Sequence, residues 1–260
     1  MELEGARVLV TGASSGIGAA AAVAFAGAGA TVGICARRAD RLVEVLERCR
    51  SRAPASCRWT VDLADLDALP GFAARADAEL GGIDILVNNA GIPMRRRMQE
   101  LALADLEAVM RVNFYAPVVL TSALLPGMLA RRRGRVVNVS SMGTRTLALG
   151  VGAYAASKAA LELYTEGLYA DLLGSGVTAQ LFVPGTTRTE FSTPRAGDRG
   201  VPWVDPDAME AEAVADALVA HVRGDRFEGH ASEALARTAA TKRSDPNEFL
   251  EKAATRVLRT

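Results

Sequence analysis

A tyrosine and a lysine four residues apart form the clearest chemical pair in this sequence. Tyr154 and Lys158 enclose the run Y-A-A-S-K, whose residues favour a helix, so both side chains share one helical face. A phenol has a pKa of about 10 and is a sluggish acid at neutral pH, but a nearby ammonium lowers that pKa. The pair predicts a general acid that protonates a carbonyl oxygen as hydride reaches carbon. By itself the same spacing also fits an ordinary surface pair.

A glycine-rich turn follows the first apolar run of the chain. Residues 11–18 read T-G-A-S-S-G-I-G and lead into an alanine-rich segment. Glycine lets the backbone approach a ligand closely, and the N–H groups and dipole that begin a helix attract a pyrophosphate. The turn predicts a dinucleotide site with the contacts Gly12, Ser14, Ser15, Gly16, Ile17 and Gly18.

The same letters fit a hydrolase nucleophile elbow, G-x-S-x-G, with Ser14 as the nucleophile. A hydrolase of this kind needs a histidine partner, and the chain has only His221 and His230. No HGGG-type oxyanion segment is present either. The dinucleotide interpretation is therefore the stronger one.

The residues after the second apolar run bear on the choice of dinucleotide. An acidic residue at this point commonly binds the ribose hydroxyls of NAD(H), but here the run ends in Arg37 and Arg38. An arginine fork binds a 2′-phosphate through charge-assisted hydrogen bonds, which favours NADP(H) over NAD(H). The alternative is that both arginines merely solvate the start of a helix.

Apolar runs and helical patterns alternate along the whole chain. Continuous hydrophobicity in several runs indicates strands buried on both faces, as in a parallel sheet covered by helices. We therefore expect a single domain, residues 1–260, with a doubly wound Rossmann-type α/β fold. A segment rich in Pro, Gly and Thr, 188–206, is expected to be a substrate loop. The expected strands are 7–10, 31–35, 57–61, 83–87, 135–139 and 177–183, and the expected helices are 17–27, 38–50, 66–80, 103–129 and 153–173.

Composition narrows the classes of partner. The 30 Lys and Arg residues balance the 30 Asp and Glu residues, so no net charge attracts nucleic acid or an anionic membrane. Three cysteines without a C-x-x-C pair are expected to be free thiols, and no metal site is expected. The uncharged stretches 16–36 and 112–130 are broken by Gly, Pro or Asn and are not expected to span a membrane. With no signal-like start, a cytoplasmic location is expected.

Five motifs in register make the sequence resemble the short-chain dehydrogenase/reductase family over about residues 5–190. They are the glycine turn, the run N-N-A-G at 88–91, a helix asparagine at Asn113, the serine Ser141 before the Y-x-x-x-K pair, and P-G at 184–185 leading to Thr189. This resemblance implies a hydride transfer between a nicotinamide and a carbonyl or alcohol. It also implies a homodimer or homotetramer paired through the helices that carry Asn113 and Tyr154.

The resemblance also implies roles for individual residues. Tyr154 would be the general acid and base, and Lys158 would hold the nicotinamide ribose and bias the ionisation of the tyrosine. Ser141 would bind the substrate oxygen, with Ser140 pointing to the other side of the strand end. Asn113 would anchor a water that links Lys158 to solvent. The further cofactor contacts implied are Asp62, Leu63, Asn89, Ala90, Gly91, Pro184, Gly185, Thr187 and Thr189. Asn88 and Asn89 could instead tie strand ends together, Asn113 could be a kink residue, and P-G could be an ordinary turn.

The substrate itself is left open by the sequence. Expected pocket walls are Pro93, Met94, 142–149, 185–191 and Trp203, which are largely apolar. Arg95, Arg96, Arg97 and Arg145 could bind an acyl thioester carrier or a carboxylate, or could form a solvated rim. The hypotheses are a carbonyl reductase or alcohol dehydrogenase of broad type, a 3-oxoacyl-thioester reductase, and a nucleotide-binding regulator without turnover.

Overall fold

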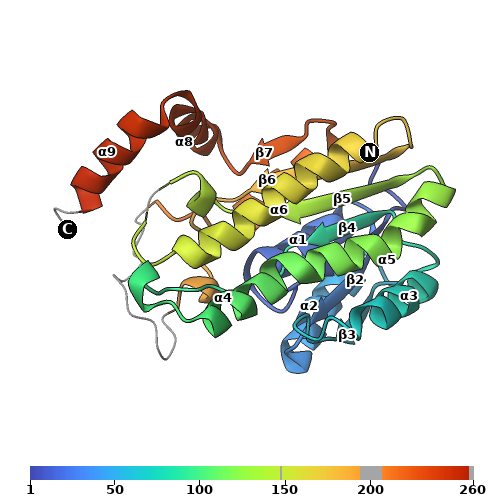
Figure 1. Cartoon of the computed structure of the whole chain (residues 1–260). Coiled ribbons are helices and arrows are strands. Elements are labelled where there is room, and N and C mark those ends of the chain that lie inside the picture. Colours follow the sequence, from blue (N-terminus) through green and yellow to red (C-terminus); the bar gives the residue numbers. More distant parts are fainter. Residues whose placement is uncertain (147, 194–206, 258–260) are drawn as a thin grey trace.

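The computed structural model describes residues 1–146, 148–193 and 207–257. Within them, seven parallel strands form one sheet with the order β3-β2-β1-β4-β5-β6-β7, and helices cover both faces (Figure 1). The expected doubly wound fold is confirmed. The strands are β1 Arg7–Thr11, β2 Thr31–Ala36, β3 Cys57–Thr60, β4 Ile85–Asn88, β5 Gly134–Val139, β6 Val177–Val183 and β7 Glu228–His230. The strand order reverses between β1 and β4, where ligands of such sheets bind beyond the carboxyl ends.

The helices divide into two layers. One layer, with α1, α2 and α7, packs on one face of the sheet, and the other, with α3, α5 and α6, packs on the opposite face. The helices are α1 Gly16–Gly27, α2 Ala39–Arg50, α3 Leu69–Leu80, α4 Leu103–Met110, α5 Ala116–Ala130, α6 Gly152–Asp171, α7 Ala211–Arg223, α8 Glu233–Ser244 and α9 Pro246–Val257. Short helical turns are η1 Met98–Glu100, η2 Arg111–Tyr115, η3 Met142–Thr144 and η4 Glu190–Ser192.

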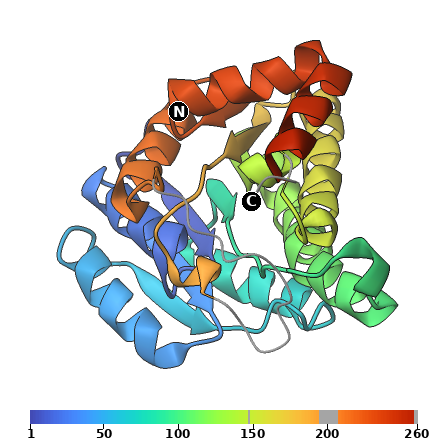
Figure 2. The same ribbon diagram turned by 90° about the vertical axis from the view of Figure 1, so that its left-hand side faces the viewer.

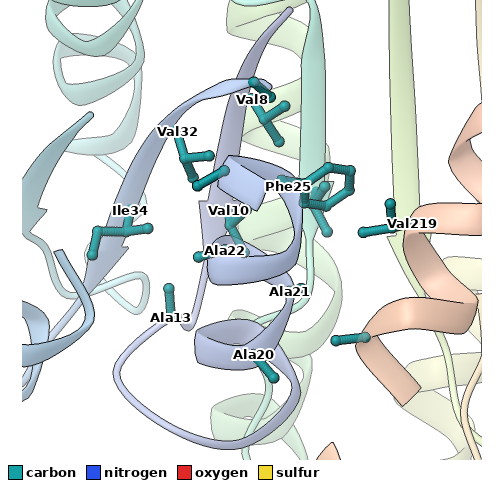
Figure 3. Close-up of a cluster of buried hydrophobic side chains, with 14 of the residues drawn as sticks. Val8, Val10, Ala13, Ala20, Ala21, Ala22, Phe25, Val32, Ile34 and Val219 are labelled. Carbon is teal, nitrogen blue, oxygen red and sulfur yellow. The ribbon is translucent and has the colours of Figure 1, made fainter. Parts of the chain in front are cut away.

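The alanine-rich sequence of α1 is explained by its position in the core. This helix lies between the sheet and α7, and Figure 3 shows Phe25 between the strand residue Val10 and Val219 of α7. Small side chains such as Ala21 and Ala22 are fully buried and allow close approach to the sheet. Because α1 is packed on both sides, its first turn is held firmly at the carboxyl end of β1.

The single helix expected over 103–129 is interrupted by a π-helical turn. The helix α4 passes through the turn η2 into α5, and Asn113 is the central residue of that turn. A π turn widens the helix locally and is frequent at functional sites. By length and composition alone, Leu103–Ala130 is also apolar enough to cross a membrane, a criterion that buried core helices meet as well. In the structure this stretch packs against α3, α6 and β5.

The elements after residue 206 were not predicted. The strand β7 has only three residues, Glu228–His230, and two of them are charged or polar, so no apolar run marks it. The helix α8 contacts β7 and runs across the end of the molecule that faces the viewer in Figure 2. The helix α9 packs on α8 and projects from the sheet (Figure 1). The carboxyl end of the sheet therefore gains a wall from α8.

Candidate active site

A cavity of about 860 Å³ lies beyond the carboxyl ends of the strands. Its lining brings together the glycine turn, the residues after β2 and β4, and the chemical pair on α6. Predicted site residues that line it are Gly12, Ser14, Ser15, Gly16, Ile17, Gly18, Arg37, Arg38, Asp62, Leu63, Asn89, Ala90, Gly91, Ser141, Tyr154, Lys158, Pro184, Gly185, Thr187 and Thr189. Asn113 is fully buried behind this lining. The size suits a drug-sized ligand or larger.

The glycine turn forms a cradle that side chains would fill. Gly12 has a φ of 68°, and a Cβ placed there would lie 2.7 Å from the Cα of Ala90. A Cβ at Gly18 would overlap the side-chain amide of Asn89 and the carbonyl oxygen of Gly12. Asn89 fastens the same contact, because its Nδ2 donates to the carbonyl of Thr11 at 3.0 Å. The ends of β1 and β4 therefore meet with no room for larger residues.

The first turn of α1 is open to an anion. Ser15 is the N-cap residue, but its side chain makes no capping hydrogen bond, and the first turn contains no acidic residue. The N–H groups at such a helix start need an acceptor, and the helix dipole favours a negative one. The residues present thus fit the pyrophosphate of a dinucleotide.

We predict that Gly18→Ala destabilises the protein by about 1–3 kcal/mol and weakens dinucleotide binding, because the added Cβ forces the turn away from Asn89. Urea unfolding and a fluorescence titration with NADPH measure the two effects. Gly27→Ala is the matched control, since a Cβ at Gly27 meets nothing within 4 Å. Equal stability and affinity in the two variants would contradict this account of the turn.

Arginines and serines gather at the end of β2, on the rim of the cavity. The guanidinium of Arg38 donates to Ser15 Oγ at 2.7 Å and to Ser14 Oγ at 3.2 Å. It also pairs with Glu190 at 2.6 Å, and this hydrogen bond lowers the pKa of the Glu190 carboxyl. Arg37 is exposed beside it. Glu190 lies within the predicted wall 185–191, but its pairing with Arg38 was not predicted, because the two residues are far apart in sequence.

Asp62 and Leu63 lie at the next strand end, after β3. Leu63 is 6% exposed, whereas Asp62 is exposed and accepts a hydrogen bond from the backbone N–H of Ala64 at 3.0 Å. Both residues line the same cavity as the arginine rim.

The chemical pair lies on α6 at the centre of the cavity. The ring of Tyr154 packs against Phe191 at 5.6 Å between centroids, and its hydroxyl lies close enough to that of Ser141 for Ser141 to favour the phenolate. The Nζ of Lys158 donates to the carbonyl oxygen of Val139 at 2.8 Å. Phenol, hydroxyl and amine therefore meet where β5 ends and α6 begins.

The pKa of the tyrosine differs from the expectation. We expected the lysine to lower it, but burial raises the pKa of Tyr154 to about 12, although the nearby Ser141 hydroxyl acts in the opposite direction. Burial also lowers the pKa of Lys158 to about 8, which the nearby Glu162 carboxylate partly opposes. Within the protein alone, both groups are thus held nearer to their neutral forms.

The side chain of Asn113 is hydrogen-bonded to neighbouring protein groups and does not line the cavity. Its Oδ1 accepts from the N–H of Ile92 at 2.8 Å, and its Nδ2 donates to Ile92 O at 3.1 Å and to Ser157 Oγ at 3.0 Å. We expected Asn113 to anchor a water, but protein partners occupy both ends of its amide. In this structure Asn113 ties the loop after β4 to α6.

The other polar residues predicted near the cavity differ in their partners and in their exposure. Ser140 also lines the cavity, but its Oγ donates to Glu162 at 2.5 Å, whereas the hydroxyl of Ser141 makes no bond to Glu162. Arg145 is 9% exposed and paired with Glu162 and Glu228, so the expectation of a cation at the cavity mouth is wrong for this residue. Arg96 pairs with Asp105 at 3.2 Å. Arg95 lines the cavity, and Arg97 is exposed outside its lining.

Some predicted wall residues lie outside the described part of the chain. These are Leu147, Trp203 and residues 194–206 of the expected substrate loop. The described walls include Pro93, Met94, Met142, Gly185 and Phe191. The wall formed by Ser232, Ala234, Leu235 and Thr238 of α8 was not predicted.

The histidines do not support the hydrolase alternative. Neither His221 nor His230 is among the residues that line the cavity with Ser14. The ring of His221 lies near Phe182, and burial lowers its pKa to about 4. His230 is 3.4 Å from Glu228. The described residues also contain no group of three His, Cys, Asp or Glu side chains that could hold a metal ion.

The chain is similar to known oxidoreductases over most of its length. A family model described as short chain dehydrogenase matches residues 6–200. An uncharacterised oxidoreductase of Mycobacterium tuberculosis is 38% identical over 84% of this chain, and the match spans 65% of that protein, less than two thirds of its length. A fatty acyl-CoA reductase of the same organism is 35% identical, over 86% of this chain and 75% of that protein.

Solved structures agree with this assignment. A short-chain dehydrogenase from Sphingobium yanoikuyae in complex with NADPH has a TM-score of 0.78 and 29% sequence identity, over 92% of this chain and 95% of that one. Its fold and the matched family region together cover both the sheet and the cavity. The chain therefore belongs to the short-chain dehydrogenase/reductase family of oxidoreductases.

Proposed function

We propose that this chain is an NADP(H)-dependent oxidoreductase that interconverts a carbonyl compound and the corresponding alcohol. The observation that carries the proposal is the meeting of the Tyr154 phenol, the Ser141 hydroxyl and the Lys158 amine in one cavity with a glycine cradle for a dinucleotide. A bound nicotinamide would supply the hydride. The side chains of the protein would then bind the substrate oxygen and deliver a proton to it.

The closeness of the Ser141 and Tyr154 hydroxyls suits a substrate oxygen placed between them. Both hydroxyls can donate to that oxygen, which stabilises the negative charge that develops during reduction. Tyr154 then passes its proton to the oxygen, and Lys158 favours the phenolate that remains. Because burial raises the pKa of Tyr154 to about 12, a neighbouring positive charge would favour the phenolate in this enclosed position.

The preference for NADP(H) is supported by the rim after β2. Arg37 and Arg38 line the cavity at the end of β2 and could bind a 2′-phosphate there, and Ser14 and Ser15 add hydroxyl groups beside them. No carboxylate ends β2, and the Sphingobium yanoikuyae relative holds NADPH. Glu190 pairs with Arg38 at 2.6 Å and would compete with the phosphate for that guanidinium. We therefore expect Arg37 to make the larger contribution to phosphate binding.

A panel of ketones, aldehydes and secondary alcohols, offered with each cofactor, tests the proposal. We expect NADPH to be consumed with at least one carbonyl compound, as measured by the near-ultraviolet absorbance of the reduced cofactor. A regulator of the same fold would bind NADPH but show no turnover with any member of the panel. That outcome would reject the proposed enzyme in favour of a nucleotide-binding regulator without turnover.

A second candidate is the reduction of an acyl thioester substrate. The reduced group would be the 3-oxo group of a 3-oxoacyl thioester or the thioester carbonyl itself. The supporting observation is Arg95, a cavity-lining cation that sits beside the apolar Met94. An apolar wall suits an acyl chain, and a cation suits the phosphates or carboxylate of its carrier. The similarity to a fatty acyl-CoA reductase favours this class.

For this candidate we predict that Arg95→Ala lowers kcat/KM for an acyl-CoA substrate by roughly tenfold, because a charge-assisted contact is lost. The rate with a neutral ketone should change less than about twofold. Steady-state kinetics with both substrates measure the split. Arg97→Ala is the matched control, since Arg97 is exposed and does not line the cavity. An equal loss with both substrates would argue against an anion contact at Arg95.

A further inference from the structure

Glu162 is a buried carboxylate on α6 that the proposed reaction does not yet use. It follows Tyr154 and Lys158 at intervals of four residues, so the three side chains form one line along the helix. Glu162 is only 6% exposed. A buried carboxylate is costly unless it is paired and hydrogen-bonded, so its partners indicate what it holds.

Those partners all come from the segment that carries Ser141. One oxygen of Glu162, Oε1, accepts from Ser140 Oγ at 2.5 Å and from Thr144 Oγ1 at 2.7 Å. The other oxygen, Oε2, accepts from the guanidinium of Arg145 at 2.5 Å. The residue before Ser141 and two residues shortly after it are thus fixed by one carboxylate.

The same segment is held from its other side by the C-terminal elements. Arg145 also pairs with Glu228 of β7 at 3.1 Å, and Glu228 pairs with Arg243 of α8 at 2.7 Å. Lys242 of α8 donates to the carbonyl of Thr144 at 2.9 Å. The charges alternate along this chain of contacts, so each buried group has a counter-charge, and the segment 140–145 has little freedom to shift.

Ser141 itself makes no bond to Glu162. Its Oγ accepts from the N–H of Gly143 at 3.0 Å, and this leaves the hydroxyl proton available on the cavity side, towards Tyr154. We propose that Glu162, backed by Arg145, is a positioning residue: it clamps the segment 140–145 onto α6 and so holds the Ser141 hydroxyl beside Tyr154. This inference rests on the proposed function.

The test compares wild-type protein with Glu162→Gln in the reduction of a carbonyl substrate found with the panel. Glutamine keeps the shape but removes the charge, and its nitrogen cannot accept from a hydroxyl or a guanidinium. We expect kcat to fall by roughly tenfold or more, because a small displacement of the catalytic geometry is costly. The Kd for NADPH should stay within about twofold. Glu166→Gln is the matched control, since Glu166 lies one turn further along α6 and is exposed.

The pH profile adds a readout that a purely structural role would not move. The charged or titratable groups on this side of Lys158 are Tyr154 and Glu162 on α6, with Arg145, His230 of β7 and Lys242 of α8 around Glu162, and Arg95 lies in the same cavity. The facing Val139 carbonyl and Asn113 amide do not titrate. Glu162 raises the pKa of Lys158, so its loss lowers that pKa, and the basic limb of the kcat profile should move to lower pH.

The rate, the pH profile and the cofactor affinity together decide the inference. A slower Glu162→Gln with a shifted profile and intact NADPH affinity supports it. Unchanged kcat, or parallel losses of stability, NADPH affinity and kcat with an unmoved profile, overturns it. If Glu162→Gln does not fold, Ser140→Ala removes a single contact without unpairing a charge, and kcat within experimental error of wild type would then overturn the inference. Absence of turnover in wild-type protein would instead reject the proposed function.

Discussion

Replacing Tyr154 by phenylalanine is expected to reduce kcat for carbonyl reduction by about 10³-fold, the range that general acid catalysis supplies. The variant keeps the ring that packs against Phe191 but loses the proton donor. Folding and NADPH binding should therefore survive. Stopped-flow measurement of NADPH oxidation gives the rate, and a fluorescence titration gives the affinity for the cofactor.

The matched control is Tyr164→Phe on the same helix. Tyr164 lies away from the cavity and packs against Phe114. Its loss should change kcat by less than about twofold. If Tyr154→Phe retained more than a tenth of the wild-type rate, the phenol would not be the proton donor. If both variants lost rate equally, the cause would lie in folding.

Arg37→Ala is expected to raise the Kd for NADPH by roughly tenfold while leaving the Kd for NADH nearly unchanged. The reason is that the guanidinium would bind a 2′-phosphate, which NADH lacks, and charge-assisted hydrogen bonds are stronger than neutral ones. Because the residue is exposed, the difference should shrink at high salt. Titrations with both cofactors at two ionic strengths measure the effect.

Arg41→Ala controls for the general loss of a positive charge on α2. Arg41 is close to Glu190, at 3.7 Å, but does not line the cavity. Its loss should weaken NADPH binding much less than the loss of Arg37. If Arg37→Ala affected both cofactors equally, the proposed preference for NADP(H) would be wrong.

The sheet was predictable because its strands are buried on both faces. Runs such as Ile85–Asn88 and Val177–Val183 are almost continuously apolar, and the predicted ranges lie within two residues of the observed ones at each end. The strand β7 was missed because it pairs at the edge of the sheet through only three residues. A strand of that length carries no periodic signal.

The cavity was predictable where local spacing determines geometry. The glycine turn and the Tyr154–Lys158 interval are short-range patterns, and the structure places both in one lining. Pairings between distant segments were not predictable. The contacts of Arg38 with Glu190 and of Arg145 with Glu162 and Glu228 depend on how loops meet after folding. The α8 wall was not predictable for the same reason. Leu235 packs against Gly185, which is 50 residues earlier in the sequence, and this contact forms only in the folded protein.

The arginines illustrate this limit most clearly. Sequence position alone grouped Arg145 with Arg95, Arg96 and Arg97 as cations near the mouth. In the structure Arg145 is buried in an ion-pair network, Arg96 is paired with Asp105, and Arg95 lines the cavity. Arginines that look equivalent in the sequence thus have different structural roles, because their burial and their counter-charges differ.

Transfer of deuterium from the cofactor to the substrate tests the central claim most directly. NADPH carrying deuterium at both C4 positions of the nicotinamide is incubated with wild-type protein and a carbonyl compound selected by the panel, and the product is analysed by mass spectrometry. We predict one deuterium on the carbinol carbon, with none transferred above background by Tyr154→Phe in a single-turnover time. Oxidation of NADPH that leaves the alcohol carbon unlabelled would contradict the account.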